Sequence, residues 1–484
     1  MVWLRKDLRL DDHEPLCQAI ASGAPVLAVY CLDPRELRTL PSGVTKTGAF
    51  RVRFLLEALQ TLRLQCRALG GDLVIRRGMP EHVLPALADE IGAQTVWCHG
   101  DHADEERRVE HAVARVLQTQ GVSLSRCWGA TMLHPDDLPW AADAIPDMFT
   151  HFRKAVEDTV RVRPPRSAPV ALRSPSVAPG DIPSLEQLGV APPPVDPRVH
   201  FAPTGGEQAG QARLQFYLWD SDRVQTYKGT RNGMLDVDDS SKLSPWLAIG
   251  CLSPRRVWSE VQRYEHTRVK NESTYWLIFE LLWRDYFAFV LAKDGNALFS
   301  AHGPKDIRMP WRTRTDRDVQ RDFAKWTAGE TGFPLIDANM QELTASGFMS
   351  NRGRQNVASF LTKNLRIDWR MGAEWFESLL IDYDVASNWG NWCYVAGVGN
   401  DAREFRVFNI HKQALDYDPQ GAYVRHWLPA LRHIPGAKAH RPDTLTADEQ
   451  VQCGCRVGSD YPSPMVNLFE SANASAALYR AARR

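Results

Sequence analysis

Residues 273–287 read Ser273-Thr-Tyr-Trp-Leu-Ile-Phe-Glu-Leu-Leu-Trp-Arg-Asp-Tyr-Phe287, and this stretch decides the fold of the C-terminal half. It is apolar on almost every side, which predicts a helix that is buried all round. Glu280 and Arg284 nevertheless stand in it, one turn apart on one face. Because buried charges need partners, we expect this helix to border a polar group inside a helical domain.

Two further segments of the same half combine polar and apolar residues in this way. They are Ser350-Asn-Arg-Gly-Arg-Gln355 and Ile381-Asp-Tyr-Asp-Val-Ala-Ser-Asn-Trp-Gly-Asn-Trp392. Their charged and amide members include Asn351, Arg354, Asp382, Asp384 and Asn388. Buried polar groups are almost always hydrogen-bonded, so the three segments together predict one shared polar ligand inside a helical bundle.

Composition sets the broad class of the protein. A chain of 484 residues is too long for one hydrophobic core, so about two or three domains are expected. Formal net charge is zero, so a nucleic-acid partner would need a local basic patch. Nine scattered cysteines are interpreted as reduced thiols, which favours an intracellular, cytoplasmic location. Cys453-Gly-Cys455 has no matching second pair, so no metal is expected, and no signal peptide or membrane-spanning run is found.

Residues 1–161 alternate short apolar runs with helix-periodic runs. The predicted strands include residues 26–31, 73–75, 95–98 and 122–124. This alternation predicts an open parallel α/β sheet of the Rossmann-like type. No Gly-x-Gly-x-x-Gly follows the first strand, and Ala49 stands where a phosphate loop requires lysine. A nucleotide cofactor is therefore not expected in this domain.

Residues 162–207 are rich in proline, which blocks helices and strand ladders, so they are predicted to form an extended linker across the surface. Helical sequence patterns dominate residues 208–484, and patterns typical of strands are scarce there. We therefore predict an N-terminal α/β domain, a long linker and an all-helical C-terminal domain.

Several segments resemble the cryptochrome/photolyase family. The opening, Trp3-Leu-Arg-Lys-Asp-Leu-Arg-Leu-Asp-Asp-His13, is similar to the start of that family. Its flavin-binding segments are resembled by Phe333-Pro-Leu-Ile-Asp-Ala-Asn-Met340, Gly347-Phe-Met-Ser-Asn-Arg-Gly-Arg354 and Asp382-Tyr-Asp384. Segments similar to the DASH-type cryptochromes are Asn232-Gly-Met-Leu235, Ala396-Gly-Val-Gly-Asn-Asp401 and Met148-Phe-Thr-His-Phe-Arg-Lys154. The resemblance spans residues 3–471, interrupted mainly by the linker.

This resemblance implies that the helical domain binds FAD. The residues implied to hold it are Tyr227, Ser240, Ser241, Lys242, Leu243, Ser244, Glu280, Arg284, Asn351, Arg354, Asp382, Asp384 and Asn388. Hydroxyls, backbone donors and Lys242 suit the pyrophosphate, particularly if Ser244-Pro245 starts a helix. Asn388 falls where the family places the residue that faces flavin N5. The alternative for Ser244 is a plain helix N-cap before Pro245. The alternative for the five polar residues Asn351, Arg354, Asp382, Asp384 and Asn388 is ion pairing within the core and helix capping.

The resemblance also implies the reaction, which is the light-driven splitting of cyclobutane pyrimidine dimers by an electron from excited reduced FAD. Glu280 is implied to contact the dimer, Asn351 to hydrogen-bond a base and Trp283 to stack on the dimer. Such an enzyme is a deoxyribodipyrimidine photolyase-type carbon–carbon lyase. The alternative for Glu280 is a helix salt bridge with Arg284.

Other implied contacts point to single-stranded DNA as the partner. Tyr394 and Gln355 stand where the duplex-repairing photolyases have a tryptophan and a methionine, and Arg352 is the candidate for the lesion phosphate. Extrusion of a damaged base costs least when the DNA is already single-stranded. A more polar pocket with weaker stacking therefore predicts repair of single strands, with poor repair of duplex.

Two further features are implied by the family. Electrons are expected to reach the flavin through Trp392, Trp369 and Trp311, although ordinary aromatic core is the alternative for each. A methenyltetrahydrofolate antenna is expected between the domains, near Glu105 and Glu106, and the segment Phe149 to Lys154 supports it. The alternative for the two glutamates is a solvated helix N-terminus, where acids favour the helix dipole.

Rival functions remain open at this level. A blue-light photoreceptor would signal through flavin photoreduction with little repair, and a nucleic-acid-binding regulator would bind undamaged strands. Glu280, Asn351 and Trp283 favour the enzyme, because a pure sensor has no need for a dimer pocket. A (6-4) photolyase is disfavoured because the paired histidines expected near Ser350 are absent.

Overall fold

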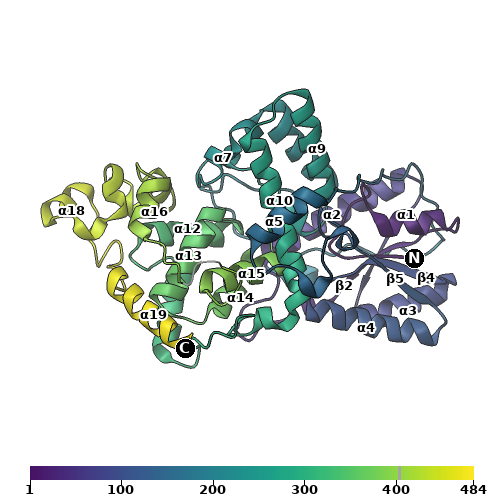
Figure 1. The fold of residues 1–484 in the computed structure, drawn as a ribbon, viewed down its shortest axis with the longest axis horizontal. Coiled ribbons are helices and arrows are strands. Elements are labelled where there is room, and N and C mark those ends of the chain that lie inside the picture. The colour runs from purple at the N-terminus through teal and green to yellow at the C-terminus, as the bar shows by residue number, and fades with distance from the viewer. Residues whose placement is uncertain (402–404, 484) are drawn as a thin grey trace.

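The computed structural model describes residues 1–401 and 405–483. Figure 1 shows an α/β part that contains the N-terminus and a larger part made of helices that contains the C-terminus. A single long helix, α10 (Glu272–Asp294), lies between the two, close to the short helix α5 (Phe149–Thr159). The two-part architecture confirms the predicted fold class.

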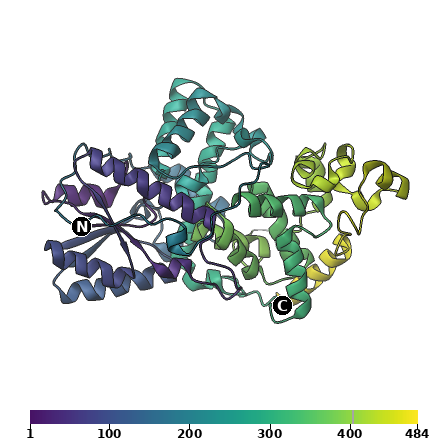
Figure 2. The same cartoon turned by 180° about the vertical axis from the view of Figure 1, so that it is seen from behind.

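Five parallel strands form the sheet in the order β3-β2-β1-β4-β5. Their bounds are β1 Val2–Leu4, β2 Ala28–Leu32, β3 Leu73–Arg77, β4 Thr95–His99 and β5 Ser123–Cys127. Four helices, α1 Glu14–Ala21, α2 Ala49–Ala68, α3 Pro80–Ile91 and α4 Asp104–Thr119, cover it on both faces (Figure 2). Because neighbouring residues of a strand point to opposite faces, Leu73 packs in the core under α1 and α2 while Val74 packs under α3 and α4.

The proline-rich segment is anchored to the α/β part rather than free of it. Arg166 N donates to Asp12 Oδ1 at 2.8 Å, and Leu172 N donates to the Leu69 carbonyl at 2.7 Å. Ile75 on the edge strand β3 donates its N–H to the Pro179 carbonyl at 2.8 Å. A proline has no N–H to offer but keeps its carbonyl, so the segment can cover this sheet edge.

Helices make up the remainder of the chain. Their bounds are α6 Glu207–Gln215, α7 Tyr227–Thr230, α8 Ser244–Ala248, α9 Pro254–Thr267, α11 Arg317–Ala328, α12 Pro334–Ser346, α13 Asn351–Ser359, α14 Trp369–Leu379, α15 Val385–Ala396, α16 Ile410–Tyr417, α17 Ala422–Trp427, α18 Ala447–Cys453 and α19 Leu468–Ala482. Short 3₁₀ turns join many of them, and the π-helical turn η9 (Phe360–Asn364) extends α13.

The central helix α10 is buried along most of its length, as the all-round apolar sequence predicts. It starts with a capping box: Asn271 accepts from the backbone N–H of Thr274, and Thr274 accepts from that of Asn271. Glycines let the helices around it approach closely. A Cβ added at Gly390 of α15 would lie 2.3 Å from Phe287 Cδ1 of α10, and one added at Gly372 of α14 would lie 2.2 Å from Trp392.

A cluster of ion pairs ties the sheet to the helices. Asp12 accepts from Arg255 at 2.7 and 2.9 Å, and it also accepts from Ser253 and from the linker at Arg166. Arg256 pairs with Asp11 nearby at 2.7 Å. The Asp12 and Arg255 side chains are almost fully buried, so this pair is a structural clamp between the two parts.

All nine cysteines fall in the described ranges, and each is a free thiol. None of the helices in residues 1–401 and 405–483 combines the length and apolar character that crossing a membrane would require.

Candidate functional site

The polar residues singled out in the helical half meet at one cavity of about 120 Å³ between α13, α14 and α15. Those that line it are Asn351, Arg354, Gln355, Asp382, Asp384, Asn388 and Trp392. They come together because α13 begins at Asn351 and α15 begins directly after Asp384. The cavity therefore combines a cation, two carboxylates and several amides with an indole wall.

An ion pair between Arg354 and Asp382 forms part of the cavity wall. Arg354 Nη2 donates to both carboxylate oxygens of Asp382, at 2.8 and 2.9 Å, and Ser244 Oγ donates to the same carboxylate at 2.6 Å. Asp382 is buried, and a buried pair is stable only if its other hydrogen-bonding positions are also used. Ser244 opens helix α8, as predicted, and joins the segment 240–244 to this cavity.

The start of α15 fixes two further side chains. Asp384 caps the helix, because its Oδ1 accepts the N–H of Ser387 at 2.7 Å. One turn later the buried Asn388 donates its side-chain N–H to the Ala373 carbonyl of α14 at 3.1 Å. This bond holds the amide in place at the cavity wall and leaves its Oδ1 for another partner.

The remaining residues predicted to touch phosphate precede Ser244 in the chain and do not line this cavity. Arg213 donates to the carbonyls of Ser240 and Ser241 at 3.2 and 2.9 Å, which fixes their backbone. Lys242 has a left-handed φ of 54°, and its ammonium lies 4.5 Å from the centroid of the Phe348 ring. Burial lowers its pKa. The structure thus places this charge against an aromatic ring, whereas the sequence suggested that it faces the phosphates. Tyr227, at the start of α7, and Leu243 are buried.

Glu280 and Arg284 do not pair with each other, so the predicted alternative of a helix salt bridge is wrong. Glu280 instead accepts from Arg231 Nη1 at 2.5 Å, and the Arg231 guanidinium lies over the ring of Trp276. Desolvation raises the pKa of the Glu280 carboxyl, and the positive charge of Arg231 opposes that rise. Arg284 donates to the carbonyls of Ala130 and Leu247, so it joins elements of the two parts.

Trp283 stands on α10 among other rings. It stacks on Phe149 of α5 with a centroid distance of 3.7 Å, and it meets Tyr394 of α15 edge to face at 5.9 Å. The contact with Tyr394 joins two of the residues expected at the lesion. The contact with Phe149 was not expected, because the segment Phe149 to Lys154 had been assigned to the antenna.

Arg352 sits at the rim, in a cluster of neutral groups. Its guanidinium donates to Gln355 Oε1 at 2.9 Å, Asn232 Oδ1 at 3.0 Å and Gln413 Oε1 at 3.3 Å, and it lies over the ring of Tyr417. Burial lowers its pKa. Among the residues described here, no carboxylate lies within ion-pair distance of Arg352. Its charge is therefore available to an anion.

The three tryptophans of the expected electron chain lie on neighbouring elements. Trp392 lines the α13–α15 cavity and packs on α14 at Gly372. Trp369, fully buried at the start of α14, and the half-buried Trp311 both donate their indole N–H to the Ala301 carbonyl, at 3.2 and 3.0 Å. One shared acceptor brings these two indoles close together.

A larger cavity of about 900 Å³ lies between the two parts of the molecule, and we call it the interdomain pocket. It opens at the carboxyl ends of β1, β2 and β3, where parallel α/β sheets bind ligands. The helical part contributes aromatic side chains from Phe299, Tyr383 and Trp389 to its wall. The pocket thus offers charged groups on one side and flat apolar rings on the other.

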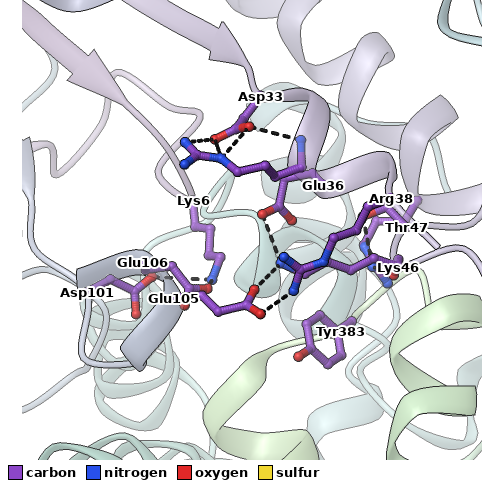
Figure 3. Close-up of polar contacts among 12 residues, drawn as sticks. Lys6, Asp33, Glu36, Arg38, Lys46, Thr47, Asp101, Glu105, Glu106 and Tyr383 are labelled. Atoms are coloured by element: carbon purple, nitrogen blue, oxygen red, sulfur yellow. Dashed lines mark hydrogen bonds and ion pairs between the residues drawn. The ribbon is translucent and has the colours of Figure 1, made fainter. Parts of the chain in front are cut away.

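Figure 3 shows the charged network of this pocket. Glu105 of α4 accepts from Lys46 at 2.7 Å and pairs with Arg38, while Lys46 also pairs with Glu36 at 3.0 Å. Glu106 pairs with Lys6 at 2.7 Å. Both glutamates lie in the first turn of α4, as the alternative of a helix N-terminus requires, but they are held by cations rather than only solvated. No residue from 149 to 154 lines the pocket.

One other set of potential ligands occurs in the α/β part, where Asp7, His13 and His99 approach one another. His99 Nδ1 lies 2.7 Å from Asp7 Oδ2, and His13 Nε2 lies 3.0 Å from the same oxygen. The N–H of Leu16 donates to His13 Nδ1, so this histidine caps α1. These contacts account for the set as a network that joins α1 to β4, and we assign no metal to it.

Family models match most of both parts. The model of DNA photolyase matches residues 1–171, and that of the FAD binding domain of DNA photolyase matches residues 276–481.

Similar proteins are known over the full length. Cryptochrome DASH of Gloeobacter violaceus is 56% identical over 483 residues, which cover 100% of this chain and 96% of the relative. Cryptochrome DASH of Synechocystis sp. is 52% identical over 482 residues, which cover 98% and 96%. The crystal structure of Synechocystis cryptochrome superposes with a TM-score of 0.95 at 51% identity over 99% of this chain and 98% of that one. A bacterial class III photolyase from Agrobacterium tumefaciens gives a TM-score of 0.87 at 30% identity over 100% and 97%.

Proposed function

The chain belongs to the DNA photolyase family and, within it, to the cryptochromes of DASH type, and on this basis we propose that it uses light and FAD to split cyclobutane pyrimidine dimers in single-stranded DNA. The alternative is a blue-light photoreceptor with little repair. A single feature supports the enzyme most directly: Trp283 of α10 and Tyr394 of α15 meet at 5.9 Å, beside the cavity that Asn388 lines.

The residues around the α13–α15 cavity suit a flavin. Arg354 offers a cationic donor, Asp382 offers a carboxylate, and the free Oδ1 of Asn388 can accept an N–H from the ring edge. The serines of the segment 240–244, which Ser244 joins to Asp382, would hold the pyrophosphate. When bound and reduced, FAD supplies the photoexcited electron that opens the cyclobutane ring.

The residues of this chain would bind and orient the lesion. Trp283 and Tyr394, which meet edge to face, would contact the dimer with their rings, and Asn351, exposed at the start of α13, would offer an amide to a base edge. Glu280 would donate a hydrogen bond to the dimer as charge builds on it, because desolvation favours its protonated form. Arg352 would hold a neighbouring phosphate.

Preference for single strands would follow from the cost of extrusion. Only one tryptophan, Trp283, is assigned to the lesion, and Tyr394, which meets it, lines a small cavity together with Gln355. A polar pocket recovers less stacking energy from an extruded dimer than two indoles would, so the cost of unpairing a duplex is not met. Zero net charge also gives little attraction for long duplex tracts.

The test is to illuminate the pre-reduced protein with dimer-containing oligothymidine, as single strand and as matched duplex, and to count the dimers that remain. We expect repair of the single strand only. The double variant Tyr394→Trp, Gln355→Met should gain duplex repair. Equal repair of both by the unmodified chain would refute the preference, and repair of neither, with FAD bound and photoreducible, would favour the photoreceptor.

A second variant tests the role of Glu280. A hydrogen bond to a charged group contributes about 1.5–3 kcal/mol, so Glu280→Ala should slow dimer splitting about tenfold to a hundredfold. The amount of bound flavin should stay unchanged. A variant with full activity would remove Glu280 from the mechanism.

We further propose that the interdomain pocket holds a folate antenna. Glu105 and Glu106 can accept the N–H groups of a pterin, the rings of Tyr383 and Trp389 can pack on it, and Arg38 and Lys46 can pair with a glutamate tail. Denaturing the purified protein should release a folate. Glu105→Gln should lower the folate content while FAD content stays constant, and an equal folate content would refute this assignment.

We also propose a division into residues 1–161, 162–207 and 208–484. The buried Asp12 of the first part contacts both of the others, since it accepts from Arg166 of the linker and from Arg255 of the helical part. Nine free thiols support an intracellular, cytoplasmic location.

A further inference from the structure

Trp389 lies next to the expected electron chain of Trp392, Trp369 and Trp311 but is not part of it. Trp389 of α15 packs edge to face on Trp369, with ring centroids 5.7 Å apart and planes at 76°. Trp389 is only 8% exposed, and its other side lies in the wall of the interdomain pocket. An electron vacancy that reaches Trp369 therefore has two neighbouring indoles, Trp311, which shares the Ala301 carbonyl with it, and Trp389, which packs on its ring.

Trp389 leads on to a tyrosine. Its indole N–H donates to the hydroxyl of Tyr383 at 3.2 Å. Tyr383 lies between Asp382 and Asp384 in sequence, and it lines both the α13–α15 cavity and the interdomain pocket. Figure 3 shows its side chain beside the charged network of that pocket. The hydroxyl accepts from Trp389, so its own proton is free to go to another group.

That other group is a carboxylate. The side chain of Glu377 on α14, 6% exposed, lines the interdomain pocket together with Tyr383. Burial raises the pKa of Glu377, and its neighbour Tyr383 opposes that rise. The Arg51 guanidinium lies 4.9 Å from the centroid of the Tyr383 ring. A nearby cation disfavours a positively charged phenol, so the electron and the proton of Tyr383 should leave together.

We propose that Trp389 and Tyr383 form a side branch of the electron chain, in which Tyr383 is the final electron donor and Glu377 takes its proton. This inference rests on the proposed function, because it requires that Trp392 lose an electron to the photoexcited flavin. In this branch Tyr383 supplies the last electron of the light-driven charge separation, and Glu377 accepts the proton. The linear chain of Trp392, Trp369 and Trp311 needs neither residue.

The step balances as follows. Trp392 gives one electron to the flavin, Trp369 refills Trp392, and Trp389 refills Trp369. Tyr383 then refills Trp389, and its O–H bond breaks as its proton moves to a carboxylate oxygen of Glu377. The products on the protein are one neutral tyrosyl radical and one protonated carboxyl group. All three tryptophans return to their starting state.

The charge around Glu377 gives this branch a pH dependence. Burial raises the pKa of Glu377 to about 7, and the charges of Lys46 and Arg51 and the hydrogen bond from Tyr383 oppose the rise, whereas Glu105 adds to it. Glu374, one turn earlier on α14, lines the same pocket. Above this pKa the carboxylate can take the proton, and below it the carboxyl is already protonated. The yield of tyrosyl radical should therefore fall as pH falls through about 7.

A second tyrosine and glutamate of this chain provide a matched control. Tyr423 donates to Glu342 at 2.6 Å, both residues are buried, and burial raises the pKa of Glu342 to about 7 as well. No tryptophan ring contact with Tyr423 occurs among the described residues. The two pairs share their chemistry but differ in access to the electron chain.

The experiment is electron paramagnetic resonance of the flavin-loaded protein, frozen immediately after illumination without added reductant. We expect a tyrosyl signal in the unmodified protein and in Tyr423→Phe. Tyr383→Phe should remove it and leave a tryptophan signal, and Trp389→Phe should lower it at least tenfold. If Tyr383→Phe fails to fold, Glu377→Gln, which keeps the phenol, should lower the tyrosyl yield and abolish its pH dependence.

The outcomes separate this inference from the proposed function. A tryptophan signal without any tyrosyl signal in the unmodified protein would overturn the branch, as would a tyrosyl signal that survives in Tyr383→Phe. Repair by pre-reduced protein does not use the branch, so it should be unchanged in Glu377→Gln. A protein that shows the tyrosyl signal but repairs no dimer would retain the branch and lose the repair function.

Discussion

Arg231 sets the ionisation of Glu280, because the two side chains are in contact and Glu280 is otherwise desolvated. Removal of the cation leaves burial unopposed, so the pKa of Glu280 should rise further. If the protonated acid donates to the dimer, splitting falls as pH rises through this pKa. In Arg231→Met the fall should therefore occur at higher pH.

The measurement is the rate of dimer splitting by pre-reduced protein across a pH series. Lys228→Met is the matched control, because Lys228 also lies over Trp276 but pairs with the exposed Glu272. Its pH profile should match that of the unmodified protein. A profile of Arg231→Met that stays in place, or moves to lower pH, would show that protonated Glu280 is not the active form.

Arg352 has amide partners only, so its charge should serve a DNA phosphate. One phosphate contact to a single strand changes the slope of log K against log salt by about 0.7. Arg352→Gln should reduce the slope by that amount and should weaken binding to undamaged and damaged strands equally. Fluorescence titrations at several salt concentrations measure this slope, and Arg441→Gln, at a residue assigned no DNA contact, is the control. An unchanged slope would place the phosphate elsewhere.

The roles of single residues were the least predictable from sequence. Glu280 and Arg231 are 49 positions apart, and no periodicity connects them. Phe149 belongs to a segment that resembled an antenna motif, yet it stacks on Trp283. A motif identifies a residue type at a position, whereas its contacts depend on how two distant helices pack.

At the scale of elements, the contact between α10 and α15 should respond to a single methyl group. A Cβ at Gly390 would meet the ring of Phe287 at 2.3 Å, and Phe287 is buried with no room to turn away. Overpacking of this kind costs about 1–3 kcal/mol. Gly390→Ala should lower stability by that amount and weaken FAD binding, as measured by thermal unfolding and flavin release. Gly229→Ala, where nothing lies within 4 Å, should do neither.

The π-helical turn η9 contains a buried cation that should make stability depend on pH. Burial lowers the pKa of Lys363 from 10.5 to about 7, with Asp401 opposing, and its Nζ donates to the Ala396 carbonyl at 2.7 Å. Between those values the unfolded chain binds a proton that the folded chain does not. The contribution of Lys363 to stability therefore rises with pH, by about 1.4 kcal/mol per unit.

Lys363→Met removes this dependence. We expect the variant to gain apparent unfolding temperature over the unmodified protein, and to gain more at pH 6 than at pH 9. Lys412→Met, at an exposed i,i+4 pair with Asp416, should show no such difference. An equal change at both pH values would mean that Lys363 remains charged throughout.

Elements were more predictable than contacts. The four predicted strands all exist, displaced by three residues or fewer at each end, because apolar runs between turn residues are typical of strands in an α/β chain. The start of α8 at Ser244-Pro245 was also foreseen, since proline favours the first helical turn. The π-helical turn η9 was not, because an added residue in a helix leaves the apolar pattern almost unchanged.

At the scale of the whole molecule, the buried pair of Asp12 and Arg255 holds the sheet, the linker and α9 together. Removal of one partner of a buried pair costs about 3–5 kcal/mol, because the other charge stays desolvated. Arg255→Met should lower the free energy of unfolding by that amount and expose the linker near Arg166 to protease. Arg256→Met breaks a more exposed pair and should cost about 1 kcal/mol or less. Equal losses of unfolding free energy in the two variants would show that the buried pair contributes no more to stability than the exposed pair.

The linker shows where composition misleads. Its prolines predicted an extended path, which is correct, but they also suggested a simple spacer. The structure uses the Pro179 carbonyl to close the β3 edge, and Arg63 donates to the same oxygen. Composition reports which groups a segment lacks, and the partners of the groups it keeps depend on the fold.

On helix α15, Asn388 and Trp392 line the α13–α15 cavity, Trp389 lines the interdomain pocket and Tyr394 meets Trp283. The roles proposed for these residues therefore all depend on how the helix is turned about its axis. An inserted or deleted residue would turn everything beyond it by about 100° and exchange these assignments at once. Evolution can therefore alter this helix by replacement but not by a change of length. Natural relatives that have lost or gained one of these functions should differ in this helix by substitutions, with insertions and deletions confined to the loops on either side.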